Sequence, residues 1–279
     1  MSPLSLVRNA TRRRVDLLAM TPAEQLRVGR LPLRLGQLLV GLWLYGTASA
    51  MFVRATLGLD PWDVFHYGVM RHLHLSLGTI VMIVGALVLL LWIPLRQWPG
   101  LGTILNSVVI GVAVDVTLSV LRAPHGGLQR WALLLGGIVV NGIGGAMYIG
   151  AQFGPGPRDG LMTGIARRTG RSIRLVRTSL EVLVLLVGWL LGGVVGVGTV
   201  VYALLIGPSV QLFLPILTVR LDPPAGSASA VEVPGRAPER PNASTPDEVR
   251  ASRSAVDGQC EREDTVGAGE EELASRHGE

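Results

Sequence analysis

Two short motifs, one in each half of the hydrophobic part of the chain, contain residue types that could bind a charged solute. The first motif runs from Leu57 to Asp63 and the second from Phe153 to Asp159. In both, a Gly precedes a Pro and an Asp at the spacing expected where a short helix begins, because Pro is favoured at the first helical position. Unpaired backbone N–H groups at such a helix start can hold an anionic group. The candidate binding residues in these motifs are Gly58, Asp60, Pro61, Asp63, Gly154, Pro157, Arg158 and Asp159.

The charged residues of these motifs have two interpretations. Asp63 and Asp159 occupy the third helical position, where a carboxylate stabilises a helix by ~0.3–1 kcal/mol, so both can be simple helix caps. Alternatively, the two short helices dip inward and direct their N-termini at one central cavity. In that interpretation Arg158, which stands where the first motif has Trp62, is suited to bind a carboxylate or a phosphate.

A further candidate pair lies inside a hydrophobic segment. Glu181 is one of only a few acidic residues between positions 33 and 221, and Arg177 precedes it by four residues, which places both on one helix face. An uncompensated charge within a membrane span costs about 2.5–3.5 kcal/mol. The two residues are therefore either a pair that neutralises itself, or Glu181 is a substrate counter-ion or a carboxylate that couples transport to protons.

Other kinds of site find little support in the residue pattern. His66, His72 and His74 suggest a metal site only superficially, because no acids or thiols cluster with them, so we predict neither a metal nor a cofactor. The chain has no Ser-His-Asp, Cys-His or zinc-ligand pattern, and we do not expect an enzyme. We also expect no nucleic-acid partner, because no RNA- or DNA-binding motif is present.

The two motifs belong to a longer internal repeat. Residues 33–121 align without a gap on residues 129–217, at an offset of 96 positions. Apolar composition alone would not place Gly, Pro and Asp in register. The matched pairs include Gly58 with Gly154, Pro61 with Pro157, Asp63 with Asp159, Gly100 with Gly196, and Thr103 with Thr199. A duplicated half in a membrane protein is typical of transporters.

The composition predicts a membrane protein made of helices. The chain is 49% hydrophobic and 16% charged, and its uncharged stretches are long enough to cross a bilayer. We predict an all-α, polytopic transmembrane helix bundle with six spans, arranged as two inverted three-helix repeats, each with a short Gly/Pro-initiated helix after its first span. The inversion follows because each repeat has an odd number of spans. The predicted spans are residues 33–53, 77–95, 101–121, 131–151, 174–192 and 198–217.

The distribution of charge predicts the orientation in the membrane. Arginines concentrate in a basic leader, residues 1–32, and around the loop at 152–173, so the positive-inside rule places both termini in the cytoplasm and the chain in the cell (inner) membrane. An acidic, Pro- and Gly-rich tail, residues 222–279, is predicted to be disordered. The basic run of Arg167, Arg168, Arg171 and Arg174 is expected to contact anionic lipid, or alternatively an acidic soluble partner.

The motifs also carry a family resemblance. The stretch from Gly154 to Gly160, followed by Thr169–Arg174 and Glu181, resembles the YczE/YitT-type bacterial integral membrane proteins. The stretch Leu57–His66 is similar to the same group, and the resemblance covers about residues 30–220. It implies a multi-pass cell-membrane protein, with no settled biochemical activity.

The sequence therefore favours a small transporter or exporter of a small anionic or amphipathic solute that works by alternating access. Asp63, Arg158, Asp159 and Glu181 would surround its central site. One alternative is a non-transporting membrane scaffold whose basic face recruits a soluble partner. Another is a permease subunit of a larger complex, which would need a separate ATPase because the chain has no Walker motif.

Overall fold

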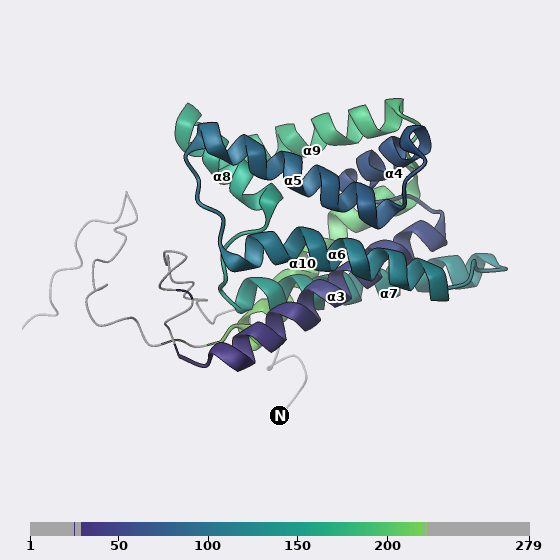
Figure 1. The fold of residues 1–279 in the computed structure, drawn as a ribbon. Coiled ribbons are helices and arrows are strands. Elements are labelled where there is room, and N and C mark those ends of the chain that lie inside the picture. Colours follow the sequence, from purple (N-terminus) through teal and green to yellow (C-terminus); the bar gives the residue numbers. More distant parts are fainter. Residues whose placement is uncertain (1–24, 26–28, 220, 222–279) are drawn as a thin grey trace, which may run out of the picture. The chain divides into compact units, whose positions relative to one another are not determined.

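The computed structural model describes residues 25, 29–219 and 221, and all regular structure within them is helical. The predicted all-α fold class is thus confirmed for this part of the chain. Most of the predicted leader and all of the predicted tail lie outside the described residues. The helices, labelled as in Figure 1, are α3 (Leu31–Ala55), α4 (Pro61–Leu73), α5 (Leu77–Leu95), α6 (Leu101–Val120), α7 (Gly127–Gly150), α8 (Pro157–Thr169), α9 (Ile173–Leu190) and α10 (Val197–Leu217).

Five of these helices, α3, α5, α6, α7 and α10, are long and apolar enough to cross a membrane. They coincide with five of the six predicted spans. The remaining prediction falls on α9, an 18-residue helix whose first half carries Arg174, Arg177 and Glu181. α9 thus carries more charged residues than any of the other five helices, and its crossing of the bilayer stays a prediction.

The helices pack in two groups that lie against each other (Figure 1). In one group α3 packs on both α6 and α7, and α7 packs on α10; in the other, α4 packs on α9 and α5 packs on α8. Glycines lie at the contact between α3 and α7. A Cβ added to Gly41 would lie 2.9 Å from the carbonyl oxygen of Gly144, and one added to Gly144 would lie 2.7 Å from that of Gly41. Small residues of this kind let membrane helices approach closely.

The packing of the first half reappears in the second half with the partners exchanged. At the offset of 96 positions, α3 corresponds to α7, α4 to α8, α5 to α9 and α6 to α10. The contact of α3 with α6 then matches that of α7 with α10, and the contact of α4 with α9 matches that of α8 with α5. Each short helix therefore packs against the long helix that follows the other short helix.

The loops before the two short helices are held by matching hydrogen bonds. The N–H of Gly198 donates to the carbonyl oxygen of Leu57 at 2.7 Å, and the N–H of Gly102 donates to that of Phe153 at 3.1 Å. Both donors lie at the start of a helix, α10 and α6 respectively. The loop of each half thus rests on the last helix of the other half, which fixes where α4 and α8 begin.

Candidate functional site

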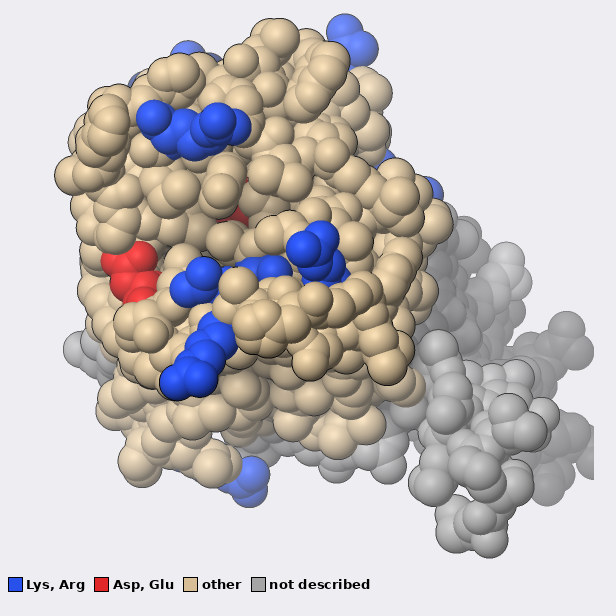
Figure 2. Space-filling model, turned by 90° about the vertical axis from the view of Figure 1, so that its right-hand side faces the viewer, with Lys and Arg blue, Asp and Glu red and all other residues tan. Residues whose placement is uncertain are grey.

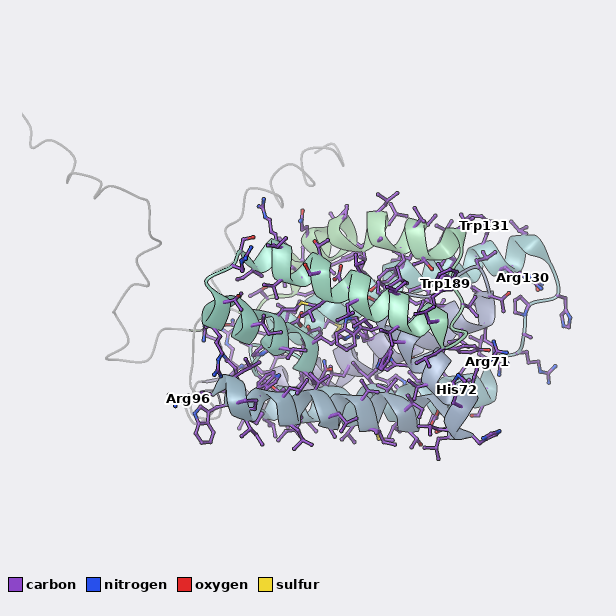
Figure 3. All side chains as sticks on the ribbon, turned by 90° about the horizontal axis from the view of Figure 1, so that it is seen from above. Arg71, His72, Arg96, Arg130, Trp131 and Trp189 are labelled. Carbon is purple, nitrogen blue, oxygen red and sulfur yellow. The ribbon has the colours of Figure 1, made fainter. Side chains whose placement is uncertain are left out.

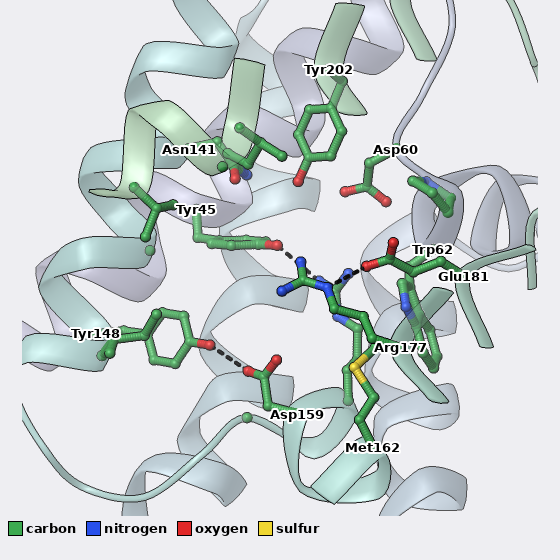
Figure 4. Close-up of a pocket in the computed structure, with 18 of the residues that line it drawn as sticks. Tyr45, Asp60, Trp62, Asn141, Tyr148, Asp159, Met162, Arg177, Glu181 and Tyr202 are labelled. Carbon is green, nitrogen blue, oxygen red and sulfur yellow. Dashed lines mark hydrogen bonds and ion pairs between the residues drawn. The ribbon is translucent and has the colours of Figure 1, made fainter. Parts of the chain in front are cut away.

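The starts of α4 and α8 meet at a cavity of about 510 Å³. Its wall also includes residues of α3, α6, α7, α9 and α10, so both halves of the repeat contribute (Figure 4). This volume lies within the range of small-molecule sites in proteins. The two short helices therefore share one cavity, as the second interpretation of the motifs requires.

Most of the residues singled out in the sequence line this cavity, and three lie behind its wall. The lining set comprises Asp60, Pro61, Pro157, Arg158, Asp159, Arg177 and Glu181. Gly58 and Gly154 have positive φ angles, 126° and 98°, and form the turns that lead into the helices. Asp63 is buried, and its carboxylate lies 3.3 Å from Nδ1 of His66. These three residues shape the site without facing it.

The local sequence explains why the helices begin at the cavity. The carboxylate of Asp60 accepts a hydrogen bond from the N–H of Asp63 at 2.8 Å, and Pro61 occupies the first helical position. Pro157 occupies the same position in α8. The side chain of Asp60 is buried, and its second oxygen makes no hydrogen bond to the described residues. Asp60 lines the cavity, and this unpaired oxygen is itself buried.

Arg158 is held between residues of the first half. Its guanidinium lies 5.6 Å from the ring centroid of Tyr45 and 5.4 Å from that of Trp62, and it donates a hydrogen bond of 3.2 Å to the Tyr45 hydroxyl. Cation–π contacts of this kind orient an arginine without neutralising it. Among the described residues no carboxylate lies within 4 Å of this guanidinium. Its charge is available to an anionic group.

Asp159 does more than cap its helix. Its Oδ2 accepts a hydrogen bond of 2.7 Å from the hydroxyl of Tyr148 on α7 (Figure 4). The ring of Tyr148 in turn meets that of Tyr45 edge to face, with centroids 6.3 Å apart. Tyr45 also contacts Arg158, so the aromatic pair links the carboxylate and the guanidinium across the cavity.

The expected pair on α9 is present and also borders the cavity. Nε of Arg177 lies 2.9 Å from Oε1 of Glu181, and the two side chains are 60% and 35% exposed. The pair that neutralises itself is thus present and forms part of the cavity wall, and a role of Glu181 as counter-ion or proton-coupling group stays a prediction. A ligand that reaches Arg177 would compete with Glu181 for it.

Sequence reasoning missed the tyrosines of the site. Tyr45 and Asn141 occupy equivalent positions in the two repeats, as do Asn106 and Tyr202, and all four line the cavity. Each half therefore contributes one Tyr and one Asn in exchanged order. A comparison of polar positions within the aligned spans could have identified them.

Arg34, which the sequence analysis also did not single out, supports the site from outside the cavity. Arg34 is fully buried in α3, where Nε donates to the carbonyl oxygen of Ala151 at 3.0 Å and Nη2 donates to that of Gln152 at 2.9 Å. Its guanidinium also lies 4.4 Å from the ring centroid of Phe153. Arg34 therefore holds the loop that leads into α8.

The basic residues at the two ends of the molecule lie away from the cavity. Arg96 lies at one end, whereas Arg71, His72 and Arg130 lie at the other (Figure 3). Figure 2 views the second end, where basic side chains are separated by uncharged residues. The run from Arg167 to Arg174 joins α8 to α9 and is exposed. None of these residues takes part in the site.

Comparison with known proteins places the chain in a family. Residues 33–215 match the "Family of unknown function (DUF6198)". An uncharacterised protein of Haemophilus influenzae is 42% identical over 180 residues, which cover 64% of this chain and 83% of that protein. The "Uncharacterized membrane protein YczE" of Bacillus subtilis is 37% identical over 163 residues, or 57% of this chain and 74% of that protein.

A more distant relative, the "Uncharacterized protein YyaS" of Bacillus subtilis, is 24% identical over 182 residues, which cover 64% of this chain and 90% of that protein. No solved structure matches the chain significantly. The resemblance to YczE-type proteins is confirmed by the relatives, and the apolar helices agree with a membrane location. Because the family match spans more than half of the chain, the chain belongs to the DUF6198 family, and it is a membrane protein with five helices long and apolar enough to cross the bilayer.

Proposed function

We propose that this protein is a small transporter or exporter that carries a small anionic or amphipathic solute across the cell membrane by alternating access. The observation that carries the proposal is the shared cavity, whose wall holds Arg158, Asp159 and Asp60 between helices from both halves. Charged groups are costly inside a membrane protein and mark substrate or ion pathways. The cavity is the natural place for a charged solute to bind.

The exchanged packing of the two halves supports alternating access. In the proposed topology the repeats have opposite orientations, and such folds bind substrate near the midplane, between halves that move against each other. The reciprocal bonds at Leu57 and Phe153 agree with a two-fold relation between the halves. We further propose that both termini lie in the cytoplasm and that the membrane is the inner membrane.

Within the site, Arg158 is the proposed binding group for the anionic part of the solute. Arg177 and Glu181 form the proposed coupling element. Protonation of Glu181 would release Arg177 from its ion pair, because a neutral carboxyl group holds a guanidinium much less strongly than a carboxylate does. Arg177 could then bind the solute together with Arg158.

Uptake into proteoliposomes tests the proposal. Purified protein is reconstituted, and a panel of small carboxylates, phosphates and amphipathic solutes is assayed with and without a pH gradient. We expect uptake of at least one solute, with loss in Arg158→Gln, while Arg167→Gln, on the exposed part of the same helix, retains it. A dependence on the gradient that disappears in Glu181→Gln would support proton coupling.

The exposed arginine run favours one alternative function. Arg167, Arg168, Arg171 and Arg174 are all exposed at the α8–α9 connection. They could contact anionic lipid, or recruit a soluble acidic partner to a membrane scaffold that transports nothing. No uptake of any solute, together with a partner that co-purifies only while these arginines are present, would favour the scaffold. A permease subunit would instead show uptake only with its ATPase added.

A further inference from the structure

The two halves differ in one place that borders the cavity. In the first half α5 packs along α6, whereas the corresponding helices of the second half, α9 and α10, have no comparable packing. We call the close contact between α5 and α6 the closed seam, and the corresponding gap between α9 and α10 the open seam. The difference can be followed residue by residue, because each position of the closed seam has a counterpart 96 residues later.

Glycines close the first seam. A Cβ added to Gly85 of α5 would lie 2.2 Å from Oγ of Ser107 on α6, and one added to Gly111 would lie 2.6 Å from the carbonyl oxygen of Gly78. At the counterpart positions on α9, Arg174 replaces Gly78 and Glu181 replaces Gly85. Long charged side chains therefore stand where α5 has no side chain.

The second seam is open along α10. Gly207, the counterpart of Gly111, has nothing within 4 Å of the position that a Cβ would take. Ala203, Gly207 and Gln211 follow one another at intervals of four on one helix face, and all three are exposed and line the cavity. Arg177 and Glu181 border the cavity from α9. The cavity therefore opens sideways, between these two helices.

In the proposed topology the opening faces the lipid, because it lies along α10, which is long and apolar enough to cross a membrane. The wall that α10 contributes beside the opening is largely apolar, because Ala203, Ile206 and Val210 line the cavity there. Arg158 and Arg177 line the same cavity, and Figure 4 shows Arg177 beside Glu181 in its wall. A charged interior behind an apolar entrance matches a molecule with a charged head and a hydrocarbon tail.

We infer that a phospholipid of the surrounding bilayer enters through the α9–α10 opening, with its phosphate at Arg158 and its acyl chains between the two helices. The inference rests on the proposed function for the identity of the site and assigns its solute to the amphipathic class. A transmembrane helix of a second copy fits the opening less well. It would bury Arg177 and Glu181 under apolar side chains, whereas a lipid head group brings charge and hydrogen-bonding groups of its own.

Site-specific photo-crosslinking in vesicles tests this inference. Benzoylphenylalanine replaces Gly207 in protein reconstituted into an equal mixture of phosphatidylethanolamine and phosphatidylglycerol, and mass spectrometry identifies the products. The matched control carries the same probe at Leu204, which is 68% exposed and does not line the cavity. A probe at Leu204 reports on lipid that merely surrounds the protein.

The expected result is a phospholipid adduct at both positions, of which only the adduct at Gly207 depends on Arg158. Arg158→Gln should lower its yield about tenfold, as the loss of a charge-assisted hydrogen bond would. Arg158→Lys, which keeps the charge, should retain more of the adduct than Arg158→Gln, and this comparison stands even if both variants are less stable. Neither substitution should alter the yield at Leu204.

Two results would overturn the inference. If neither substitution changes the adduct yield at Gly207, the probe reports only the lipid that surrounds the protein. If the product at Gly207 is a protein–protein crosslink, a second copy covers the opening. Uptake of soluble solutes is measured separately. If uptake occurs without an Arg158-dependent lipid adduct, the transporter proposal survives and the lipid inference fails. If the adduct forms but neither a soluble solute nor the phospholipid itself is moved across the bilayer, the lipid site stands and the transporter proposal fails.

Discussion

Arg158 contacts Trp62, the residue that occupies its own position in the other repeat. The guanidinium lies 5.4 Å from the ring centroid of Trp62, and the two residues are 96 positions apart. Two residues that occupy equivalent positions under a two-fold rotation can contact each other only close to the rotation axis. The contact therefore marks the centre of the exchanged packing, and it shows that the cavity wall departs from symmetry there, with a cation on one side and an indole on the other.

Exchange of these two residues tests this relationship. Trp62→Arg alone should destabilise the protein, because it places two guanidinium groups together and removes a cation–π contact worth about 0.5–2 kcal/mol. The double variant Trp62→Arg with Arg158→Trp restores the pair in reversed order, so its melting temperature in detergent should lie nearer that of the native chain. A double variant no more stable than Trp62→Arg alone would show that the positions are not equivalent.

The contrast between the two seams predicts opposite responses to the same substitution. Gly111→Ala should lower the free energy of unfolding by about 1–3 kcal/mol, because the added methyl group meets the backbone of Gly78. Gly207→Ala should be neutral or stabilise by up to ~1 kcal/mol, since its position is open and Ala favours a helix. Thermal unfolding of the two variants side by side measures the difference. Equal losses of unfolding free energy in the two variants would mean that α9 and α10 pack as closely as α5 and α6.

Arg34 and its repeat counterpart Arg130 offer a similar matched pair. Arg34→Met leaves the carbonyl groups of Ala151 and Gln152 without that donor. Each lost hydrogen bond should lower the free energy of unfolding by about 1–3 kcal/mol. Arg130 is exposed, so Arg130→Met should change the melting temperature little. Arg34→Met should also weaken solute binding, because the loop that it holds leads into α8. Unchanged stability in Arg34→Met would show that other contacts hold this loop.

The proposed topology can be tested without a substrate. A reporter fused after Arg122 should be periplasmic, and one fused after Arg168 should be cytoplasmic, because α7 lies between the two fusion points and crosses the membrane once. Cysteine labelling of a Cys260→Ser background, with single cysteines at His125 and Arg171, provides an independent check. Both positions labelled from one side would remove the inverted repeat.

Much of the framework could be predicted because the signals are local. Pro61 and Pro157 at first helical positions, and the Gly that precedes each motif, located α4 and α8 correctly. The predicted spans coincide with helices because uncharged apolar stretches of this length can satisfy their backbone only within a helix. The prediction was weakest at α9, where Arg174, Arg177 and Glu181 interrupt the apolar pattern.

The candidate site was predicted in part. The carboxylates and arginines stood out because few charged residues lie within the hydrophobic body, but Tyr45, Tyr148 and Tyr202 carry no comparable signal. The sequence around a tyrosine in an apolar span looks the same whether its side chain faces lipid, a neighbouring helix or a cavity. Asp63 was expected beside the central site; its carboxylate lies next to His66, and the residue does not line the cavity.

The amino-acid sequence by itself determined that the chain is a repeated set of helices, where each short helix begins, and which charged groups its hydrophobic body contains. These properties depend on residues close together in the chain. Only the tertiary structure decided that Arg158 lies between Tyr45 and Trp62, that Tyr148 bonds Asp159, and that α9 and α10 leave an opening where α5 and α6 leave none. Such relationships depend on how helices far apart in the sequence pack, and a single Gly or Arg at a contact decides whether two of them can close.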